Sequence, residues 1–113
     1  MLKPFFRAVI QMPNFVRVAD INDLKPGENK VVSVNGEDVG LFNVGGQFYA
    51  IGNVCPHKGG PLGEGFLEEN IVTCPWHGWR FDVKTGLSPI IPTAKVPSYK
   101  VKVEGSDVLV SLE

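Results

Sequence analysis

The stretches Cys55-Pro56-His57 and Cys74-Pro75-Trp76-His77 contain every cysteine and every histidine of this 113-residue chain. Each stretch holds one cysteine and one histidine, and sixteen residues, several of them glycine, separate the two stretches. Cysteine thiolate and histidine imidazole are ligands that suit zinc, copper and iron–sulfur centres. If the two stretches meet in the fold, all of these ligands come together at one point. The pattern therefore indicates a metal centre.

A three-stranded meander is predicted before the first stretch. Apolar residues suited to strands recur over 30–34 and 38–44. Asn35-Gly36 between them is typical of a type I′ turn, whose two central residues take left-handed backbone. Gly45-Gly46 links the second segment to a third at 47–51. The third strand therefore delivers the chain into the first cysteine–histidine stretch.

The other segments also have strand patterns. A hairpin within 66–73, turning at Glu69-Asn70, leads into the second stretch. The remaining predicted strands are 15–19, 79–83, 99–104 and 108–112. Residues 20–24 are compatible with one helical turn, and the loop at 87–97 is too rich in proline for a helix. No window has sustained helical periodicity, so the sequence predicts an all-β domain.

Size and composition indicate one domain. A chain of 113 residues with 43% hydrophobic residues is long enough for a single core. Pro13-Asn14 interrupts the chain just before the first predicted strand, so we expect an N-terminal extension at residues 1–14 and a domain at residues 15–113. The metal-binding loops of that domain are expected at residues 53–65 and 74–80.

Charge and hydropathy exclude two classes of partner. The net charge is −1, from eleven basic and twelve acidic residues scattered along the chain. Such a chain has no positive patch that would neutralise the phosphates of a nucleic acid. No apolar run reaches the roughly 20 residues that cross a bilayer, and the opening segment does not read as a signal peptide. We therefore expect a cytoplasmic protein without nucleic-acid or membrane partners.

The ligand pattern alone leaves several kinds of site open. Two cysteines and two histidines satisfy a tetrahedral zinc ion as well as an iron–sulfur cluster. Mixed zinc sites usually place both cysteines on one element and both histidines on the other, whereas each stretch here supplies one of each. If the cysteines bind one iron and the histidines another, each stretch spans a binuclear cluster, as in a Rieske [2Fe-2S] centre. A zinc site, a metal-free loop and a single disulfide are the alternatives.

The two stretches resemble a known family. Cys55-Pro56-His57-Lys58-Gly59-Gly60, together with Cys74-Pro75-Trp76-His77-Gly78-Trp79, looks like the ligand motif pair of Rieske ferredoxins and of the Rieske domains of ring-hydroxylating oxygenases. The likeness runs from about Phe15 onward. It implies a Rieske-type fold of stacked antiparallel sheets, with a small cluster-binding subdomain formed by two loops.

The resemblance also implies the roles of individual residues. The metal ligands of one Rieske-type [2Fe-2S] cluster per chain would be Cys55, His57, Cys74 and His77. By this resemblance the two thiolates bind the inner iron, and the two imidazoles bind the outer, more exposed iron through Nδ1. The segment from Pro89 to Pro92 resembles the proline loop that covers the cluster. The aromatic residues expected to pack around the site and exclude water are Trp76, Trp79 and Phe81.

A low reduction potential is a further expectation. High-potential Rieske proteins of respiratory chains carry hydroxyl groups at the positions of Trp79 and Phe81, and a second cysteine pair that forms a disulfide between the loops. This chain has neither feature. Because fewer donors stabilise the reduced cluster, we expect a potential near the low end of the Rieske range, about −150 mV.

Some activities are excluded by the residues that the sequence lacks. An oxygenase of this superfamily also needs a mononuclear iron held by two histidines and a carboxylate, but both histidines are already assigned. The sequence has no nucleotide-binding fingerprint and is too short for a flavin domain, so it does not take a hydride from a nicotinamide by itself. We expect an electron-transfer protein without catalytic residues.

The resemblance implies a Rieske ferredoxin, which accepts one electron from a flavoprotein reductase and passes it to a terminal oxygenase. Both partners are expected to dock transiently over His57, His77 and the proline loop. The alternative is the Rieske-type small subunit of a NAD(P)H-dependent nitrite reductase, because that subunit shares the cluster motif. A zinc-stabilised β module that binds other proteins is a third hypothesis.

Overall fold

The structure is a computed structural model that describes residues 14–112 of the chain. The described residues form nine strands and two short 3₁₀ helices. The strands are β1 Val16–Asp20, β2 Asn29–Val34, β3 Glu37–Val44, β4 Gln47–Gly52, β5 Phe66–Glu68, β6 Ile71–Thr73, β7 Arg80–Asp82, β8 Ser98–Glu104 and β9 Asp107–Ser111. The helices are η1 Ile21–Asp23 and η2 Leu62–Glu64. The prediction of an all-β domain is confirmed.

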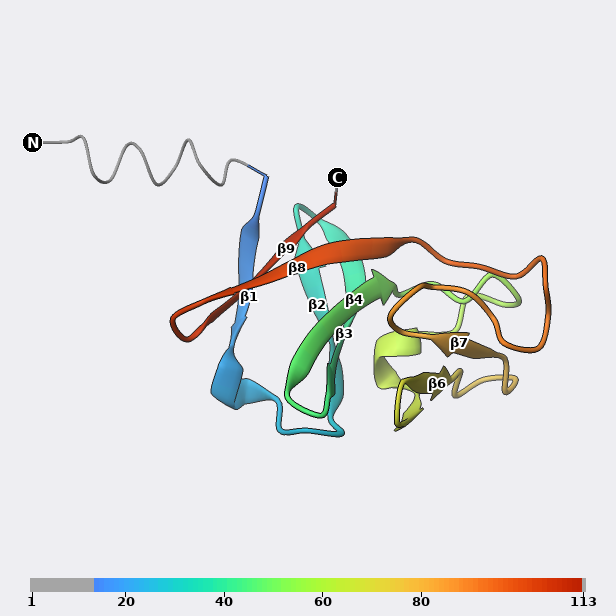
Figure 1. Cartoon of the computed structure of the whole chain (residues 1–113). Coiled ribbons are helices and arrows are strands. Elements are labelled where there is room, and N and C mark those ends of the chain that lie inside the picture. Colours follow the sequence, from blue (N-terminus) through green and yellow to red (C-terminus); the bar gives the residue numbers. More distant parts are fainter. Residues whose placement is uncertain (1–13, 113) are drawn as a thin grey trace, which may run out of the picture.

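Two antiparallel sheets make up the fold (Figure 1). The larger sheet has six strands in the order β1-β9-β8-β4-β3-β2, and its two edge strands contact each other, so the sheet curves toward a barrel. The smaller sheet has three strands in the order β5-β6-β7. The small sheet lies on the right in Figure 1, where the connection from β7 to β8 makes the outermost loop.

Tight turns place the strands as the sequence predicts. Asn35-Gly36 adopts φ values of 52° and 85°, the left-handed backbone of a type I′ turn, between β2 and β3. Gly45-Gly46 joins β3 to β4 with φ values of 61° and 100°. Glu69 turns the chain between β5 and β6 with a φ of 56°. Strands β4 and β6 therefore end just before the two cysteine–histidine stretches, as predicted.

One buried core joins the two sheets and contains both cysteines. Phe42 from β3 and Ile51 from β4 pack with Val72 from β6 and Phe81 from β7. The other buried members of this core are Cys55, Leu62, Cys74, Val83, Ala94 and Val96. A second core lies inside the large sheet. Because the first core both attaches the small sheet and buries the thiols, the attachment of the small sheet also shapes the candidate metal site.

Strand β8 differs from its sequence pattern at one end. Its alternation predicts one buried and one wet face, and Tyr99 and Val101 do pack against the core of the large sheet. Val103 continues the same alternation but is 47% exposed. It lies next to the turn into β9, at the rim of an open groove that Phe48 also lines. The alternation therefore marks the correct face of β8, but the rim of the sheet leaves Val103 in contact with solvent.

The predicted helical turn at 20–24 is confirmed as η1. The Asp20 carboxylate accepts a hydrogen bond from the Asn22 N–H (2.9 Å), and the Asp20 N–H donates to the Asp23 carboxylate (2.9 Å). This reciprocal cap satisfies backbone groups at the start of the helix.

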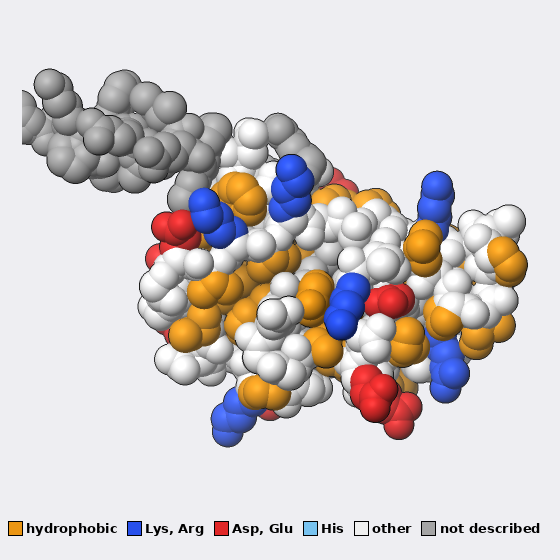
Figure 2. All heavy atoms as spheres, viewed as in Figure 1, with side chains coloured by type: hydrophobic (Ala, Val, Ile, Leu, Met, Phe, Trp, Pro, Cys, Tyr) orange, Lys and Arg blue, Asp and Glu red, His pale blue; other side chains and the backbone are white. Residues whose placement is uncertain are grey.

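The predicted N-terminal extension at residues 1–14 lies outside the described residues, apart from Asn14. Between residues 14 and 112 there is no helix long and apolar enough to cross a membrane. Charged side chains are spread over the face shown in Figure 2, with basic and acidic groups interspersed. One exposed ion pair joins the Nε of Arg17 on β1 to the Oδ1 of Asp107 on β9 (2.7 Å).

Gly86, in the turn after β7, packs closely against the backbone of Val96. Gly86 has a φ of +80°, and a Cβ at this position would overlap the carbonyl oxygen of Val96, whose N–H donates to the Gly86 carbonyl (2.8 Å). We expect Gly86→Ala to lower the free energy of unfolding by about 2–4 kcal/mol, because it adds a backbone clash to the strain of positive φ.

Gly105 provides the matched control for this substitution. Its φ is +62°, but a Cβ there would meet open space, so Gly105→Ala should cost only about 1 kcal/mol. Denaturant titration followed by circular dichroism measures both losses. Equal losses in the two variants would contradict the importance of the contact with Val96.

Candidate metal centre

Two backbone hydrogen bonds close the first ligand loop, which follows β4. The Cys55 N–H donates to the Gly60 carbonyl (3.0 Å), and the Gly59 N–H donates to the Cys55 carbonyl (2.8 Å). Gly59 has a φ of 82°, a left-handed conformation that glycine adopts without steric cost. The chain therefore turns back sharply after Cys55, and His57 on this turn is exposed.

The second ligand loop repeats this closure. The Cys74 N–H donates to the Trp79 carbonyl (2.7 Å), the Gly78 N–H donates to the Cys74 carbonyl (3.2 Å), and Gly78 has a φ of 79°. In both loops the cysteine thus bonds to the residues four and five positions further on. The histidine stands two positions after the cysteine in the first loop and three positions after it in the second. The two imidazoles therefore leave equivalent loops from different places.

Two asparagines fix the segment between the loops. The Asn53 Oδ1 accepts a hydrogen bond from the Gly63 N–H (2.7 Å). The Asn29 Nδ2 donates to the carbonyls of Gly63 (2.7 Å) and Gly65 (3.2 Å). These bonds tie η2 to the first loop and to β2. Neither asparagine is among the residues predicted from the sequence. A polar residue directly after an apolar strand is a signal for Asn53, but nothing near Asn29 indicates a partner 34 positions away.

The two thiols lie inside the protein and close together. Cys55 is 2% exposed and Cys74 is 3% exposed, and neither is in a disulfide. Burial raises the pKa of the Cys55 thiol; a hydrogen bond from the His57 backbone lowers this pKa, and a hydrogen bond with the Cys74 thiol raises it. Gly60 lies against Cys74, because a Cβ on Gly60 would stand 2.6 Å from the Cys74 Sγ. A side chain at Gly60 would push the two loops apart.

The two imidazoles lie outside the protein and also contact each other. The ring centroids of His57 and His77 are 4.9 Å apart, with an angle of 85° between the planes. His57 stacks on Trp79, with centroids 4.6 Å apart and an interplanar angle of 12°. The structure thus brings the two predicted imidazole ligands together, as it does the two predicted thiol ligands.

The predicted ligands form two like pairs, one of thiols and one of imidazoles. Among residues 14–112, no three side chains of histidine, cysteine, aspartate or glutamate are grouped so as to hold one metal ion. A Rieske [2Fe-2S] cluster takes two cysteines on one iron and two histidines on the other, which requires two like pairs. The donor set fits such a cluster, with the thiols inside and the imidazoles outside.

The aromatic residues near the loops divide into two groups. Phe81 is fully buried with the cysteines, and the half-buried Trp79 packs against the same core, as predicted. Trp76 packs at the site only with the base of its side chain: its Cβ and Cγ lie against Gly60, but the residue is 58% exposed. Trp76 stands two positions after its cysteine, like His57 in the first loop, and residues at this position of the turn point outward.

The proline-containing segment at 87–97 packs beside the small sheet. Ala94 and Val96 are buried in the core that holds the cysteines. Pro89 and Ile90 line a shallow pocket together with residues of β6 and β7, and Ile90 is 63% exposed. The segment therefore lies at the same end of the molecule as the ligand loops, and its covering of a cluster stays a prediction.

Comparisons with known proteins agree with this geometry. Residues 14–100 match the family model of the Rieske [2Fe-2S] domain. The chain is 37% identical over 101 residues to the ferredoxin component of the naphthalene 1,2-dioxygenase/salicylate 5-hydroxylase systems of Ralstonia sp., covering 88% of this chain and 97% of the relative. It is 40% identical over 99 residues to the ferredoxin component of biphenyl 2,3-dioxygenase of Rhodococcus jostii, covering 86% and 92%.

Solved structures show the same fold. The ferredoxin of carbazole 1,9a-dioxygenase from Nocardioides aromaticivorans matches with a TM-score of 0.83 and 35% identity over 88% of this chain and 99% of that one. A complex of reduced oxygenase and oxidized ferredoxin in carbazole 1,9a-dioxygenase contains a chain that matches with a TM-score of 0.81 and 31% identity, over 88% and 94%. A nitrite reductase small subunit matches with a TM-score of 0.74 over 85% and 96%, but at 22% identity this likeness concerns the fold alone. The family model and the ferredoxin relatives, together with the two ligand loops of this chain, show that it belongs to the Rieske [2Fe-2S] domain family.

Proposed function

We propose that this chain is a Rieske ferredoxin that carries single electrons from a flavoprotein reductase to a terminal oxygenase. The observation that carries the proposal is the pairing of two buried thiols with two exposed imidazoles in one site. Relatives that are named ferredoxin components of dioxygenase systems support it. The nitrite reductase alternative is not favoured, because the similarity to that small subunit extends only to the fold.

We infer that Cys55 and Cys74 bind the inner iron of the cluster, and that His57 and His77 bind the outer iron through Nδ1. Burial of the thiols and exposure of the imidazoles support this order. The bound cluster supplies a site that takes up and releases one electron. The protein's part is to hold the four ligands in fixed positions, so that little has to rearrange when the charge of the site changes.

The surroundings of the site give the electron one route. Phe81 and the shared core exclude water from the side of the thiols. The exposed edges of His57 and His77 then form the face through which an electron enters and leaves. Trp76 is 58% exposed beside this face, and an exposed indole is a suitable anchor for a docking partner. A small, transient interface is typical of redox partners.

The catalytic chemistry belongs to the partner protein. Both histidines of the chain are assigned to the cluster, so none is left for the mononuclear iron of an oxygenase. The carbazole dioxygenase complex, in which a ferredoxin contacts its oxygenase, supports a terminal oxygenase as the acceptor. A flavoprotein suits the donor, because a flavin accepts a hydride from a nicotinamide and can release single electrons. We further propose a cytoplasmic location, and a domain at residues 15–113 preceded by an extension at residues 1–14.

Reconstitution tests this function directly. The cluster-loaded chain is mixed with NADH, a flavoprotein reductase and the terminal oxygenase of a biphenyl or naphthalene dioxygenase system. We expect stopped-flow absorbance to show reduction of the chain by the reductase and reoxidation by the oxygenase, with product formed only when the loaded chain is present. The metal-free chain is the control. Failure of reduction contradicts the proposed donor, and failure of reoxidation by every oxygenase tried contradicts the proposed acceptor.

Loss of one thiol should abolish the cluster. We expect the wild-type protein to be red-brown and to contain equal amounts of iron and acid-labile sulfide. Cys74→Ser and Cys55→Ser should each lose the colour, the iron and the sulfide, because the inner iron loses a thiolate ligand. Visible spectra and metal analysis give the result, and circular dichroism checks that the variants are folded. A colourless, zinc-containing wild-type protein would support the zinc module instead. An intact spectrum in Cys74→Ser would overturn the ligand assignment.

Phe81 offers a probe of the reduction potential. Its side chain is fully buried with the two cysteines, so we expect the hydroxyl of Phe81→Tyr to hydrogen-bond to a ligand sulfur. If that bond strengthens by about 1 kcal/mol on reduction, the midpoint potential rises by about 40 mV. We expect wild type near −150 mV, at about the low end of the Rieske range. Voltammetry measures both values.

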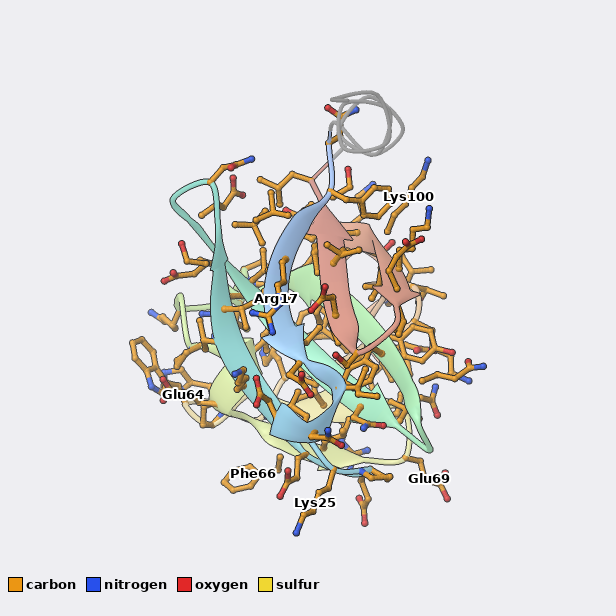
Figure 3. All side chains as sticks on the ribbon, turned by 90° about the vertical axis from the view of Figure 1, so that its left-hand side faces the viewer. Arg17, Lys25, Glu64, Phe66, Glu69 and Lys100 are labelled. Atoms are coloured by element: carbon orange, nitrogen blue, oxygen red, sulfur yellow. The ribbon has the colours of Figure 1, made fainter. Side chains whose placement is uncertain are left out.

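Phe66 is the matched control for this probe. It is 68% exposed and points away from the molecule (Figure 3). Phe66→Tyr should therefore leave the midpoint potential unchanged. A wild-type midpoint above zero would contradict the low-potential assignment, and equal potentials in wild type and Phe81→Tyr would contradict the proposed hydrogen bond.

A further inference from the structure

The two ligand loops meet without a covalent bond between them. Cys55 and Cys74 are the only cysteines in the sequence, and both are free. The backbone hydrogen bonds that close the loops each join two residues of the same loop. The contacts between the loops are made by other groups. Gly60 lies against Cys74 and the base of the Trp76 side chain, and His57 contacts His77 and Trp79.

Of the two ring contacts of His57, the one with Trp79 is stacked. With centroids 4.6 Å apart and planes only 12° from parallel, the imidazole lies face to face on the indole. A rotation of the imidazole about its Cβ–Cγ bond would drive the ring edge into the indole. The contact with His77 is edge-to-face at 85°, which leaves the plane of His57 less restricted. Trp79 is therefore the contact that sets the plane of the His57 ring.

Trp79 is held both by its backbone and by its side chain. Its backbone carbonyl accepts the Cys74 N–H (2.7 Å), and its side chain packs against the core that contains both cysteines. Trp76, three positions earlier on the same loop, is instead 58% exposed. Trp79 thus provides a fixed surface that belongs to the second loop but supports a ligand of the first.

We propose that Trp79 is a positioning residue, whose indole holds the His57 imidazole in the orientation in which it binds the outer iron and thereby joins the two ligand loops. This inference rests on the ligand assignment proposed above. A group that orients a metal ligand narrows the range of geometries at the metal and slows the ligand's departure. Trp79 does so by stacking its indole on the imidazole.

Three variants of the cluster-loaded chain test the inference. Trp79→Leu removes the flat surface, and Trp79→Phe keeps an aromatic face. Trp76→Leu is the matched control on the same loop, because leucine keeps the Cβ and Cγ atoms that lie against Gly60. The measurements are the electron paramagnetic resonance spectrum of the reduced protein, the midpoint potential, and the rate of iron release to a chelator. Circular dichroism and thermal unfolding of each variant report the state of the fold.

We expect Trp79→Leu to broaden the resonance lines, to shift the midpoint potential and to release iron at least several-fold faster than wild type. Trp79→Phe should stay close to wild type, and Trp76→Leu should match it. The inference would be overturned if Trp79→Leu and Trp76→Leu had the same resonance linewidths, the same midpoint potential and the same rate of iron release. If Trp79→Leu assembles no cluster, a cluster retained by Trp79→Phe at equal thermal stability supports positioning. Equal loss of cluster and stability in both variants would show a packing role only and overturn it.

Failure of the ligand assignment is recognised separately. If His57 and His77 are ligands, pulsed electron paramagnetic resonance of the reduced wild-type protein should detect hyperfine couplings to nitrogen atoms of two coordinated imidazoles. Absence of these couplings contradicts the proposed ligands whatever the Trp79 variants do. Two nitrogen couplings in wild type, with Trp79→Leu indistinguishable from Trp76→Leu, contradict only the role of Trp79.

Discussion

The site depends on two buried thiols lying side by side although Cys74 follows Cys55 only after nineteen positions along the chain. Strands β4 and β6 carry the chain to the two cysteines, and both strands contribute to the core that surrounds them. A neutral thiol is only weakly polar and packs readily in an apolar core. Here the two thiols contact each other, and apolar side chains such as Phe42 and Phe81 make up much of the remaining surroundings. The core therefore both attaches the small sheet and sets the separation of the two ligand loops.

The arrangement of the site from inside to outside suits an electron carrier. The thiols are dry and held by packing, whereas the imidazoles are exposed and held by ring contacts. A buried inner half resists water and chelators, and an exposed outer half brings the metal close to a partner. The turn chemistry produces this difference: both loops close in the same way, so each cysteine points inward while the residues two or three positions later point outward.

Much of the fold could be predicted because its signals are local. The turn residues Asn35-Gly36 and Gly45-Gly46, and the alternation in most of the strands, are readable from neighbouring positions. The four candidate ligands could be predicted because each of two short stretches contains one cysteine and one histidine, and the chain has no others. The bond from Asn29 to Gly63 joins distant segments, and the exposure of Val103 depends on where the sheet ends, so no local pattern contained them. The exposure of Trp76 follows from its place in the closed turn, which becomes visible only once the hydrogen bonds of the two loops are compared. The identity of the family came from the motif pair, not from strand patterns that many β proteins share.

The order of strands has a consequence for how this domain can be joined to other proteins. Strands β1 and β9, which carry the two ends of the domain, belong to the large sheet on the left in Figure 1, whereas β6 and β7 lie on the right with the small sheet. The large sheet reaches the site through the end of β4, the shared core and the two asparagines. A linker or a further domain attached at either end would leave the imidazole face open. One compact unit is thus suited both to free diffusion between partners and to incorporation into a longer polypeptide.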